Sequence, residues 1–343
     1  MIHRTDAARQ APWQVEFAAA IRDPETLARV LGLPDTWLVA AQRAHKLFPV
    51  RVPPAYLARI RPGDPEDPLL RQVLPLDLEE VFQPQFSKDP VGDLAAQVAP
   101  GVLHKYEGRV LLTATGACAI HCRYCFRRHF PYAQAHAARD RWAAAIAHLA
   151  ADRSIREVIL SGGDPLTLND DKLAGLMDAL HGLPHIKRLR LHTRVPVVIP
   201  NRVDDGLLGL FDETPLGVVM VLHINHPREI DDAVVRACAR LRSARVTLLN
   251  QAVLLAGVND DADVLAGLSE RTFEAGILPY YLHMLDRVEG AAHFAVDTAR
   301  ALGLWEALRI RLPGYLVPRL VREEAGAAAK VPVVAVGADP GCW

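Results

Sequence analysis

The feature that most constrains this chain is a run of three cysteines, Cys118, Cys122 and Cys125, directly after an apolar segment. Thiolates at positions i, i+4 and i+7 of one loop can bind three irons of a four-iron cluster. No fourth cysteine lies nearby, so the fourth iron would have no protein ligand and would be open for chemistry. Ferredoxin-type runs, which serve electron transfer, use four cysteines at other spacings. The chain must therefore fold so that one loop presents three sulfurs together.

Three other interpretations of these cysteines are open: a zinc site, a disulfide pair, or buried thiols without chemical function. Structural zinc usually takes four ligands, and His121 lies inside the loop, where it could not easily complete a tetrahedron. Cys238, in a predicted helix, and Cys342 show no spacing that pairs them with the triplet. An odd number of cysteines and no signal peptide argue against a secreted disulfide framework. We therefore expect a reduced, cytoplasmic protein.

Composition narrows the class of protein further. The 343 residues are 50% hydrophobic, which is ample for a large core, and the formal net charge is −1. Nucleic-acid binders usually carry a strong basic excess, so none is expected as a partner. The longest apolar runs, such as Leu216 to Leu222, fall far short of the roughly 20 residues that span a bilayer. We expect no membrane segment.

The first hundred residues differ in pattern from those that follow. They contain helical patterns at 13–31 and 37–46, and then a stretch from Pro53 to Pro75 in which prolines prevent long regular elements. This pattern predicts an N-terminal helical and extended cap over residues 1–104. The central unit is predicted over 105–311, with a short C-terminal segment over 312–343.

From residue 109 onward, strand-length apolar runs alternate with helical patterns. The predicted strands are 109–115, 157–160, 187–192, 217–224, 246–255 and 278–285. The predicted helices are 139–151, 170–180, 204–211, 229–242, 262–275 and 298–308. Six βα units imply a parallel sheet with right-handed crossovers. Six units are too few for a closed eight-stranded barrel, so we expect a partial (β/α)6 barrel with its site at the C-terminal ends of the strands.

Residues with chemical potential follow each of these strands. They are the cysteine loop, Ser161-Gly162-Gly163-Asp164, His192-Thr-Arg194, His223-Ile-Asn-His226, Asn250 with Gln251, and Asp286. Polar residues and glycines accumulate in any loop, so a single instance is weak evidence. Six instances at the same edge of one predicted sheet favour a shared site.

Three features beside the strands suggest ligands. The paired glycines Gly162 and Gly163 let a backbone approach a ligand closely, although such pairs are often ordinary turns. Arg127 follows the cysteines and could bind a carboxylate with its forked guanidinium, although adjacent arginines are commonly a solvated surface pair. The run 104–109 offers cations and an aromatic ring that would suit a phosphate-bearing aromatic cofactor.

With these motifs, the chain resembles the lysine 2,3-aminomutase family, the branch of radical S-adenosylmethionine (SAM) enzymes that also carries pyridoxal 5′-phosphate (PLP). The similar runs occur in the family's order and are 118–128, 161–166, 192–200, 223–226, 249–255, 279–281 and 290–294. They extend over about residues 105 to 332, and the set is highly specific for the family.

The resemblance implies a radical SAM partial barrel in which the three cysteines bind a [4Fe-4S] cluster and the open iron is chelated by SAM. The residues that match the family's SAM contacts are Ser161, Gly162, Gly163, Asp164, Arg194, His223 and Gln251.

The resemblance also assigns the PLP site. Lys330 matches the catalytic lysine that forms the Schiff base with PLP, in the C-terminal run Gly326-Ala-Ala-Ala-Lys330-Val-Pro332. Alanines replace the usual glycines, so we expect the turn to reach its place with fewer residues at positive φ. Lys105, Tyr106 and Arg109 match further PLP contacts, with a lysine in place of an arginine at one of them.

The family's substrate contacts match Asp286 and Glu323, which would bind the ε-ammonium of L-lysine, and Arg127, which would bind its α-carboxylate. Glutamate replaces the usual aspartate at position 323. Two acids in a closed pocket suit a cationic side chain and would repel an acidic one. The implied reaction is an isomerisation of L-α-lysine to (R)-β-lysine.

Compact length and the runs 46–53, 67–73 and 279–294 resemble the EpmB-type branch, which makes (R)-β-lysine for the modification of elongation factor P. That branch implies a one-electron donor such as flavodoxin or ferredoxin, a functional link to an elongation factor P β-lysine ligase, and a homo-oligomer. Two alternatives stay open: a stand-alone aminomutase of lysine catabolism or osmolyte synthesis, and a non-catalytic iron–sulfur or PLP-binding scaffold.

Overall fold

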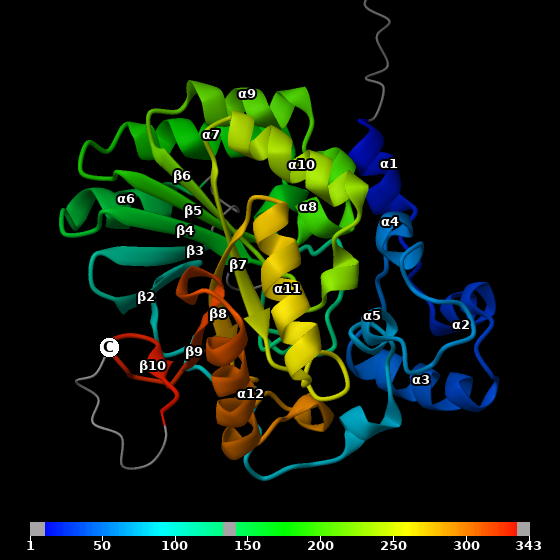
Figure 1. Cartoon of the computed structure of the whole chain (residues 1–343). Helices are drawn as coiled ribbons and strands as arrows, with labels where there is room; N and C mark the ends of the chain where they lie inside the picture. Colours follow the sequence, from blue (N-terminus) through cyan, green and yellow to red (C-terminus); the bar gives the residue numbers. More distant parts are fainter. Residues whose placement is uncertain (1–10, 133–141, 335–343) are drawn as a thin grey trace, which may run out of the picture.

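A computed structural model describes residues 11–132 and 142–334. Its centre is one ten-stranded sheet in which the strands lie in sequence order, from β1 to β10, without closing into a barrel (Figure 1). The strands are β1 (Gln97–Ala99), β2 (Val102–Tyr106), β3 (Arg109–Thr115), β4 (Glu157–Gly162), β5 (Arg188–Thr193), β6 (Gly217–Leu222), β7 (Thr247–Val253), β8 (Leu278–His283), β9 (Arg319–Arg322) and β10 (Val331–Pro332).

Parallel pairing runs from β3 to β9, and antiparallel pairs flank it at both edges. The six predicted strands correspond to β3 to β8 and agree to within two residues at most of their ends. The predicted α/β fold, a partial (β/α)6 barrel, is confirmed as an open sheet with six βα units. The sequence did not predict β1, β2, β9 and β10, which are short and lack the long apolar runs of the central strands.

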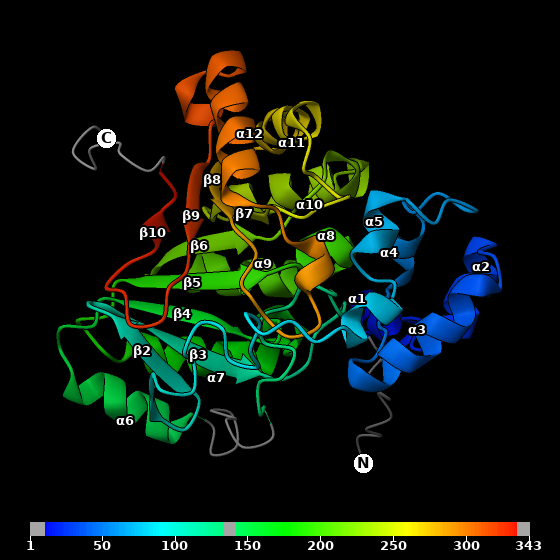
Figure 2. The ribbon, with the colours of Figure 1, turned by 90° about the horizontal axis from the view of Figure 1, so that it is seen from below.

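Helices cover the outer face of the sheet (Figure 2). In the βα part they are α6 (Ala143–Ala151), α7 (Asp170–His181), α8 (Val195–Val198), α9 (Asp205–Glu213), α10 (Asp232–Ser243), α11 (Ala262–Glu274) and α12 (Thr298–Arg311). The predicted helix 139–151 is confirmed over 143–151, and its first residues lie outside the described ranges.

Local sequence explains why the long helices begin where they do. Five of them start after an Asn or Asp whose side chain accepts a hydrogen bond from a backbone N–H of the first turn, which satisfies an otherwise unpaired donor. These N-caps are Asn169, Asp204, Asp231, Asp261 and Asp297. Each helix thus starts at a defined residue after its strand.

The N-terminal residues form five helices on one side of the sheet, of which α4 contacts α8 (Figure 1). They are α1 (Pro12–Ala18), α2 (Pro24–Leu31), α3 (Thr36–Leu47), α4 (Pro54–Leu57) and α5 (Pro68–Arg71). The predicted helical stretch 13–31 is interrupted, because Asp23 caps a new helix that has Pro24 in its first turn.

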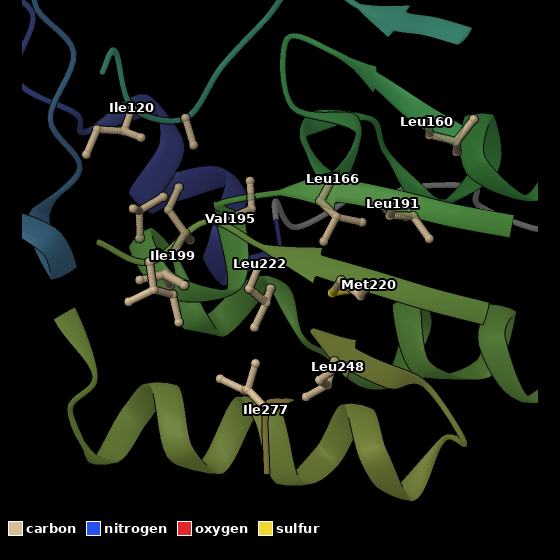
Figure 3. Close-up of a cluster of buried hydrophobic side chains, with 14 of the residues drawn as sticks. Ile120, Leu160, Leu166, Leu191, Val195, Ile199, Met220, Leu222, Leu248 and Ile277 are labelled. Atoms are coloured by element: carbon tan, nitrogen blue, oxygen red, sulfur yellow. The ribbon is translucent and has the colours of Figure 1, made fainter. Parts of the chain in front are cut away.

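One cluster of buried apolar side chains extends from Trp13 in α1, through the space between the strands and helices, to Val333 after β10. Part of it, with Leu191, Met220 and Leu248 on neighbouring strands, is shown in Figure 3. The N-terminal helices and the C-terminal segment therefore share a core with the sheet. The predicted boundaries after residues 104 and 311 stay a prediction.

Among the described residues, none of the helices is both long enough and apolar enough to cross a bilayer.

Candidate active site

A cavity of about 580 Å³ lies at the C-terminal ends of the parallel strands. Every residue that the sequence analysis assigned to the cluster, SAM, PLP or substrate lines this one cavity. They are Lys105, Tyr106, Arg109, Cys118, Cys122, Cys125, Arg127, Ser161, Gly162, Gly163, Asp164, Arg194, His223, Gln251, Asp286, Glu323 and Lys330. The structure thus brings together residues that are spread over more than two hundred positions of the chain.

The cysteine loop follows β3 and is held from behind by the N-terminal segment. The backbone N–H of His121 donates to the carbonyl oxygen of Arg51 (3.0 Å), and that of Arg123 donates to the carbonyl oxygen of Gln72 (2.9 Å). The buried Arg123 guanidinium also binds both carboxylate oxygens of Glu79, at 2.8 and 2.5 Å. The residues between the cysteines therefore anchor the loop, while the three sulfurs line the cavity.

The three cysteines are free thiols. Burial, together with the neighbouring Cys122, raises the pKa of Cys125 to about 11. In residues 11–132 and 142–334, no three His, Cys, Asp or Glu side chains are placed to share a single metal ion. A four-iron cluster does not need that arrangement, because each cysteine binds a different iron. Three thiols from one loop that line the cavity, with Cys238 buried apart from them in α10, fit a cluster with one open iron.

The turn after β4 packs directly on the start of the cysteine loop. Gly162 has φ +105°, and a Cβ on Gly163 would lie 2.3 Å from the carbonyl oxygen of Ala117. The N–H of Gly163 donates to the carbonyl oxygen of Thr115 at 2.7 Å. The hydroxyl of Tyr132 donates to the carbonyl oxygen of Gly162 at 2.6 Å. Both glycines are therefore required by close backbone packing, independently of any ligand.

Asp164 joins this turn to the end of β5. Its buried carboxylate accepts hydrogen bonds from Thr193 Oγ1 (2.6 Å), from the N–H of Arg194 (2.7 Å) and from the N–H of Leu166 (3.1 Å). Burial raises the pKa of Asp164, and these hydrogen bonds oppose the rise. The side chain predicted to bind SAM is thus engaged in shaping the site.

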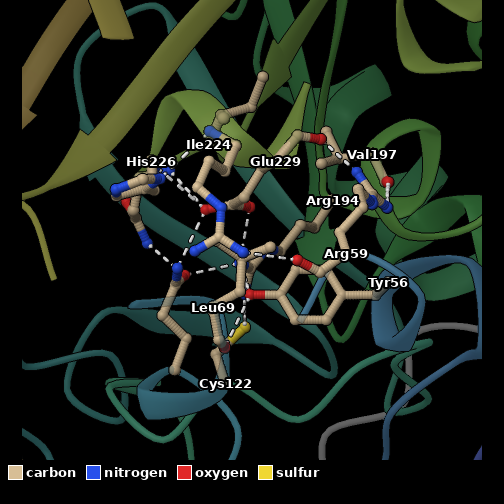
Figure 4. Close-up of polar contacts among 12 residues, drawn as sticks. Tyr56, Arg59, Leu69, Cys122, Arg194, Val197, Ile224, His226 and Glu229 are labelled. Atoms are coloured by element: carbon tan, nitrogen blue, oxygen red, sulfur yellow. Dashed lines mark hydrogen bonds and ion pairs between the residues drawn. The ribbon is translucent and has the colours of Figure 1, made fainter. Parts of the chain in front are cut away.

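Arg194 lies behind the cysteine loop in a network of buried polar groups (Figure 4). Its Nη1 donates to Cys122 Sγ at 2.8 Å. Its Nη2 donates to Gln72 Oε1 (2.6 Å) and Glu229 Oε2 (2.8 Å), and the guanidinium stacks on the Tyr56 ring, 5.2 Å from the ring centroid. The sequence did not predict these partners, because Gln72 and Tyr56 come from the N-terminal segment and belong to no motif of the cavity.

Three histidines that line the cavity have no hydrogen-bond partner at Nε2 among the residues that the structure describes: His192, His223 and His283. Burial, with nearby cations such as Arg194, lowers the pKa of His223 to about 4, so its imidazole is neutral near pH 7. Gln251 Oε1 also has no partner. An unsatisfied buried polar group costs about 1–3 kcal/mol, so these atoms suit a ligand that supplies hydrogen bonds. SAM, which is rich in polar groups, fits this requirement.

A chain of ionic contacts crosses the cavity from the β4 turn toward the C-terminal segment. Arg127 donates to Ser161 Oγ (2.9 Å) and to Asp93 Oδ2 (2.6 Å). Lys105 Nζ lies 2.6 Å from Asp93 Oδ1 and 3.3 Å from Glu323 Oε1. Asp93 is 1% exposed and connects the two cations. The sequence analysis missed it, because a single aspartate in the irregular stretch before β1 carries no motif signal.

The chain of contacts ends at Lys330, whose Nζ donates to Glu323 Oε2 at 2.8 Å. Burial acts to raise the pKa of Glu323, but the Lys330 and Lys105 ammonium groups outweigh it and lower that pKa to about 2. Asp286 faces the same end of the cavity, and burial together with the charge of Glu323 raises its pKa to about 7. The turn before Lys330 has Gly326 at φ +81°, while Ala327, Ala328 and Ala329 do not adopt positive φ.

Arginines at this end of the cavity suit a phosphate group. Arg109 stacks on Tyr106, with its guanidinium carbon 4.6 Å from the ring centroid. Arg109 and Arg319 both line the cavity, and within the described residues neither forms an ion pair with a carboxylate. Guanidinium groups without a carboxylate partner can donate hydrogen bonds to phosphate oxygens. Together with Lys330, they fit PLP.

Comparison with known proteins agrees with this site. Residues 112–266 match the model of the radical SAM superfamily, so the fold and the cysteine loop define a radical SAM protein, a class that uses a [4Fe-4S] cluster and SAM. The chain is 48% identical to L-lysine 2,3-aminomutase of Haemophilus influenzae, over 92% of this chain and 93% of that protein. It is 47% identical to that of Escherichia coli (94% of each chain), and 32% identical to that of Clostridium subterminale (94% of this chain, 77% of the relative). The chain belongs to the lysine 2,3-aminomutase family.

Proposed function

We propose that this protein is a PLP-dependent radical SAM isomerase that converts L-α-lysine to (R)-β-lysine. One observation carries the proposal: the three cysteines, Lys330 and the acidic pair Asp286 and Glu323 line a single cavity. We infer the reaction from the family to which the chain belongs, and we infer a position for each component from the residues that line the cavity.

Cys118, Cys122 and Cys125 would hold the cluster, and the β4 turn with His223 and Gln251 would hold SAM beside it. When bound, the cluster and SAM supply the removal of a hydrogen atom from an unactivated carbon. The protein's part is positioning and exclusion of water. The tight packing of Gly163 on Ala117 fixes the turn against the cysteine loop, which keeps the two binding regions adjacent.

Lys330 would hold PLP through Nζ, with Lys105, Tyr106 and Arg109 around the ring and phosphate. When bound, PLP supplies an aldehyde that links the substrate's amine and permits the nitrogen to migrate. Lysine is the residue type for this task because its primary amine forms a reversible linkage to a carbonyl carbon. Lys330 would hold the cofactor through Nζ until the amine of the substrate takes its place.

The two ends of the substrate would be bound by opposite charges. Arg127 is held by Asp93 and Ser161, so its guanidinium is oriented before the α-carboxylate arrives. Asp286 and Glu323 provide negative charge for the ε-ammonium. An acidic side chain in the same place would face desolvated like charges, which costs several kcal/mol. This arrangement supports lysine as the substrate.

We further propose that the product serves the modification of elongation factor P, as the resemblance to the EpmB-type branch implies. The near-complete alignment with the two relatives of about 47–48% identity supports a protein of their compact kind. This role would require a cytoplasmic location, a one-electron donor such as flavodoxin or ferredoxin, and a ligase that accepts β-lysine. A stand-alone aminomutase of lysine metabolism would share every residue of the site.

The test is an anaerobic assay of the reconstituted, reduced protein with SAM, PLP and L-lysine. Chiral chromatography with mass spectrometry should detect (R)-β-lysine, and Lys330→Ala and Cys122→Ala should abolish it. Cleavage of SAM with unchanged lysine would refute the lysine assignment and keep the radical SAM chemistry. No cleavage of SAM by the reduced, cluster-loaded protein would favour a non-catalytic scaffold. Attachment of the product to elongation factor P by a purified ligase would then separate the two metabolic roles.

A further inference from the structure

Lys330 already places an ammonium group on the acid that is proposed to recognise the substrate. Its Nζ is 2.8 Å from Glu323 Oε2 and 5.7 Å from the centroid of the Tyr281 ring. The side chains of Lys330 and Glu323 are 20% and 17% exposed, so the pair is largely removed from solvent. The proposed substrate carries the same four-carbon ammonium side chain as Lys330. The structure therefore contains an internal copy of the group that Glu323 would bind.

Both carboxylate oxygens of Glu323 already have cationic partners, because Lys105 Nζ lies on Oε1 and Lys330 Nζ lies on Oε2. Asp93 is committed to Lys105 and Arg127, at 2.6 Å each, and Lys105 also contacts Glu323. A further ammonium brought to Glu323 would meet the ammonium groups of Lys105 and Lys330, which already occupy its two oxygens. Unbalanced charge is costly where solvent is largely excluded.

We propose that the Lys330 ammonium occupies the ammonium-binding position on Glu323 until PLP is attached, so that the cofactor must be linked before L-lysine can bind. This inference rests on the proposed function, because it takes lysine as the substrate and PLP as the cofactor. It adds an order of binding and names the group that blocks the site. Lys330 is thus both the attachment point of the cofactor and an internal competitor of the substrate.

The chemistry of attachment explains why the block is released. The Lys330 ammonium loses one proton to solvent, and its nitrogen then condenses with the aldehyde carbon. A C=N bond forms, and the carbonyl oxygen leaves as water. The nitrogen no longer offers the three donor hydrogens of an ammonium. Glu323 would then be a carboxylate with one fewer cationic partner in a low-dielectric place, and the ε-ammonium of the substrate restores that partner.

The test is a calorimetric titration of L-lysine into the full chain. PLP and SAM are left out, so that only binding is measured. The unaltered protein should bind lysine weakly. Lys330→Met retains an unbranched side chain of similar length and removes the charge, so it should bind lysine at least about tenfold more tightly, a change of about 1.4 kcal/mol. Norleucine, which lacks the ε-ammonium, should bind both proteins alike. Adding Glu323→Gln to Lys330→Met should return the affinity to the weak value.

Equal affinity of the unaltered protein and Lys330→Met for lysine would overturn the inference, as would a similar gain for norleucine. These outcomes are separate from the function test. Tight lysine binding by Lys330→Met with no β-lysine from the loaded enzyme would support the inference and refute the aminomutase assignment. Formation of β-lysine by the loaded enzyme, together with equal lysine affinities of the unaltered protein and Lys330→Met, would support the aminomutase assignment and refute the inference.

A second measurement uses the unaltered chain and does not depend on folding of the Lys330 variant. Limited acylation with acetic anhydride, read by peptide mass spectrometry, should modify Lys330 several-fold more slowly than the exposed Lys88. Glu323→Gln should accelerate the modification of Lys330 and leave that of Lys88 unchanged. Acylation of Lys330 at the rate of Lys88 in the unaltered protein would contradict the proposed occupancy.

Discussion

Two groups of buried charges border the cavity, and they are built differently. Behind the cysteine loop, Arg194 and Arg123 have several fixed partners each, and the side chains of Arg194, Arg123 and Glu79 are at most 5% exposed. At the opposite end, Lys105 and Lys330 are 18% and 20% exposed and both contact Glu323, while Lys105 also contacts Asp93. A guanidinium is a rigid fork, whereas an ammonium is a point charge on a flexible stem. The cluster end is therefore built to hold a geometry, and the substrate end to exchange partners.

The largest effect is expected from breaking the rigid group at Glu79. Its carboxylate binds Arg123 and Arg128 at 2.5 Å each, so Glu79→Ala leaves two buried cations without this partner. We expect a loss of about 3–5 kcal/mol in the free energy of unfolding, measured by urea denaturation, and a lower iron content after reconstitution. Glu80→Ala, at a neighbouring exposed residue, is the matched control and should change the free energy of unfolding and the iron content little. A Glu79→Ala protein as stable as the unaltered protein would show that the buried charges behind the cysteine loop do not form a rigid group.

The packing between the β4 turn and the cysteine loop is tested by Gly163→Ala. The new Cβ would lie 2.3 Å from the carbonyl oxygen of Ala117, so the turn must move away from the loop. We expect SAM to bind about tenfold more weakly to the cluster-loaded protein, measured by equilibrium binding, and stability to fall by about 1–3 kcal/mol. Gly175→Ala in α7 meets open space and should be neutral or stabilising. Unchanged SAM affinity in Gly163→Ala would show that the position of this turn does not determine SAM binding.

The exchangeable end is tested by the pH dependence of lysine binding. Burial and Glu323 raise the pKa of Asp286 to about 7, so this carboxyl is mostly protonated below pH 7 and mostly charged above it. The affinity of the loaded protein for lysine should therefore rise from pH 6 to pH 8. Asp286→Asn should bind lysine more weakly and lose most of this rise, because the amide does not titrate. The same pH profile in both proteins would assign the titration to another group.

The smallest effect is expected on the electronic properties of the cluster. Arg194 Nη1 donates to Cys122 Sγ, and hydrogen bonds to cluster sulfurs favour the reduced state. Arg194→Gln should make the midpoint reduction potential more negative, measured by potentiometric titration with electron paramagnetic resonance. Arg188→Gln, at an exposed side chain, should leave the potential unchanged. A potential that does not move in Arg194→Gln would limit this residue to a packing role.

Sequence patterns predicted the parts of the site that are encoded locally. Apolar runs located β3 to β8, and most of the residues singled out after those strands, from Cys118 to Asp286, do meet in one cavity, although His226 and Asn250 are not among its lining residues. This succeeded because parallel strands place their C-terminal ends on one edge of a sheet. The assigned roles of these residues in binding SAM, PLP and lysine stay predictions.

The supporting residues could not be predicted in the same way. Glu79, Asp93 and Gln72 act through contacts with residues 34 to 122 positions away, and they lie in short, irregular stretches without periodicity. Their importance comes from the packing of the N-terminal segment on the sheet. The interruption of the helical pattern 13–31 was visible as Asp23-Pro24, a capping residue followed by a proline, but apolar periodicity continues across it.

The main-chain bonds from His121 to Arg51 and from Arg123 to Gln72 have a consequence for biogenesis. Three cysteines within eight residues suggest a peptide that could bind a cluster by itself. Their positions in the folded protein, however, depend on residues around Arg51 and Gln72, which are synthesised earlier. Iron should therefore be inserted late, after the two parts of the chain have docked. Retention of the metal would then report on completed assembly of the whole protein, and damage far from the cysteines would first appear as loss of colour.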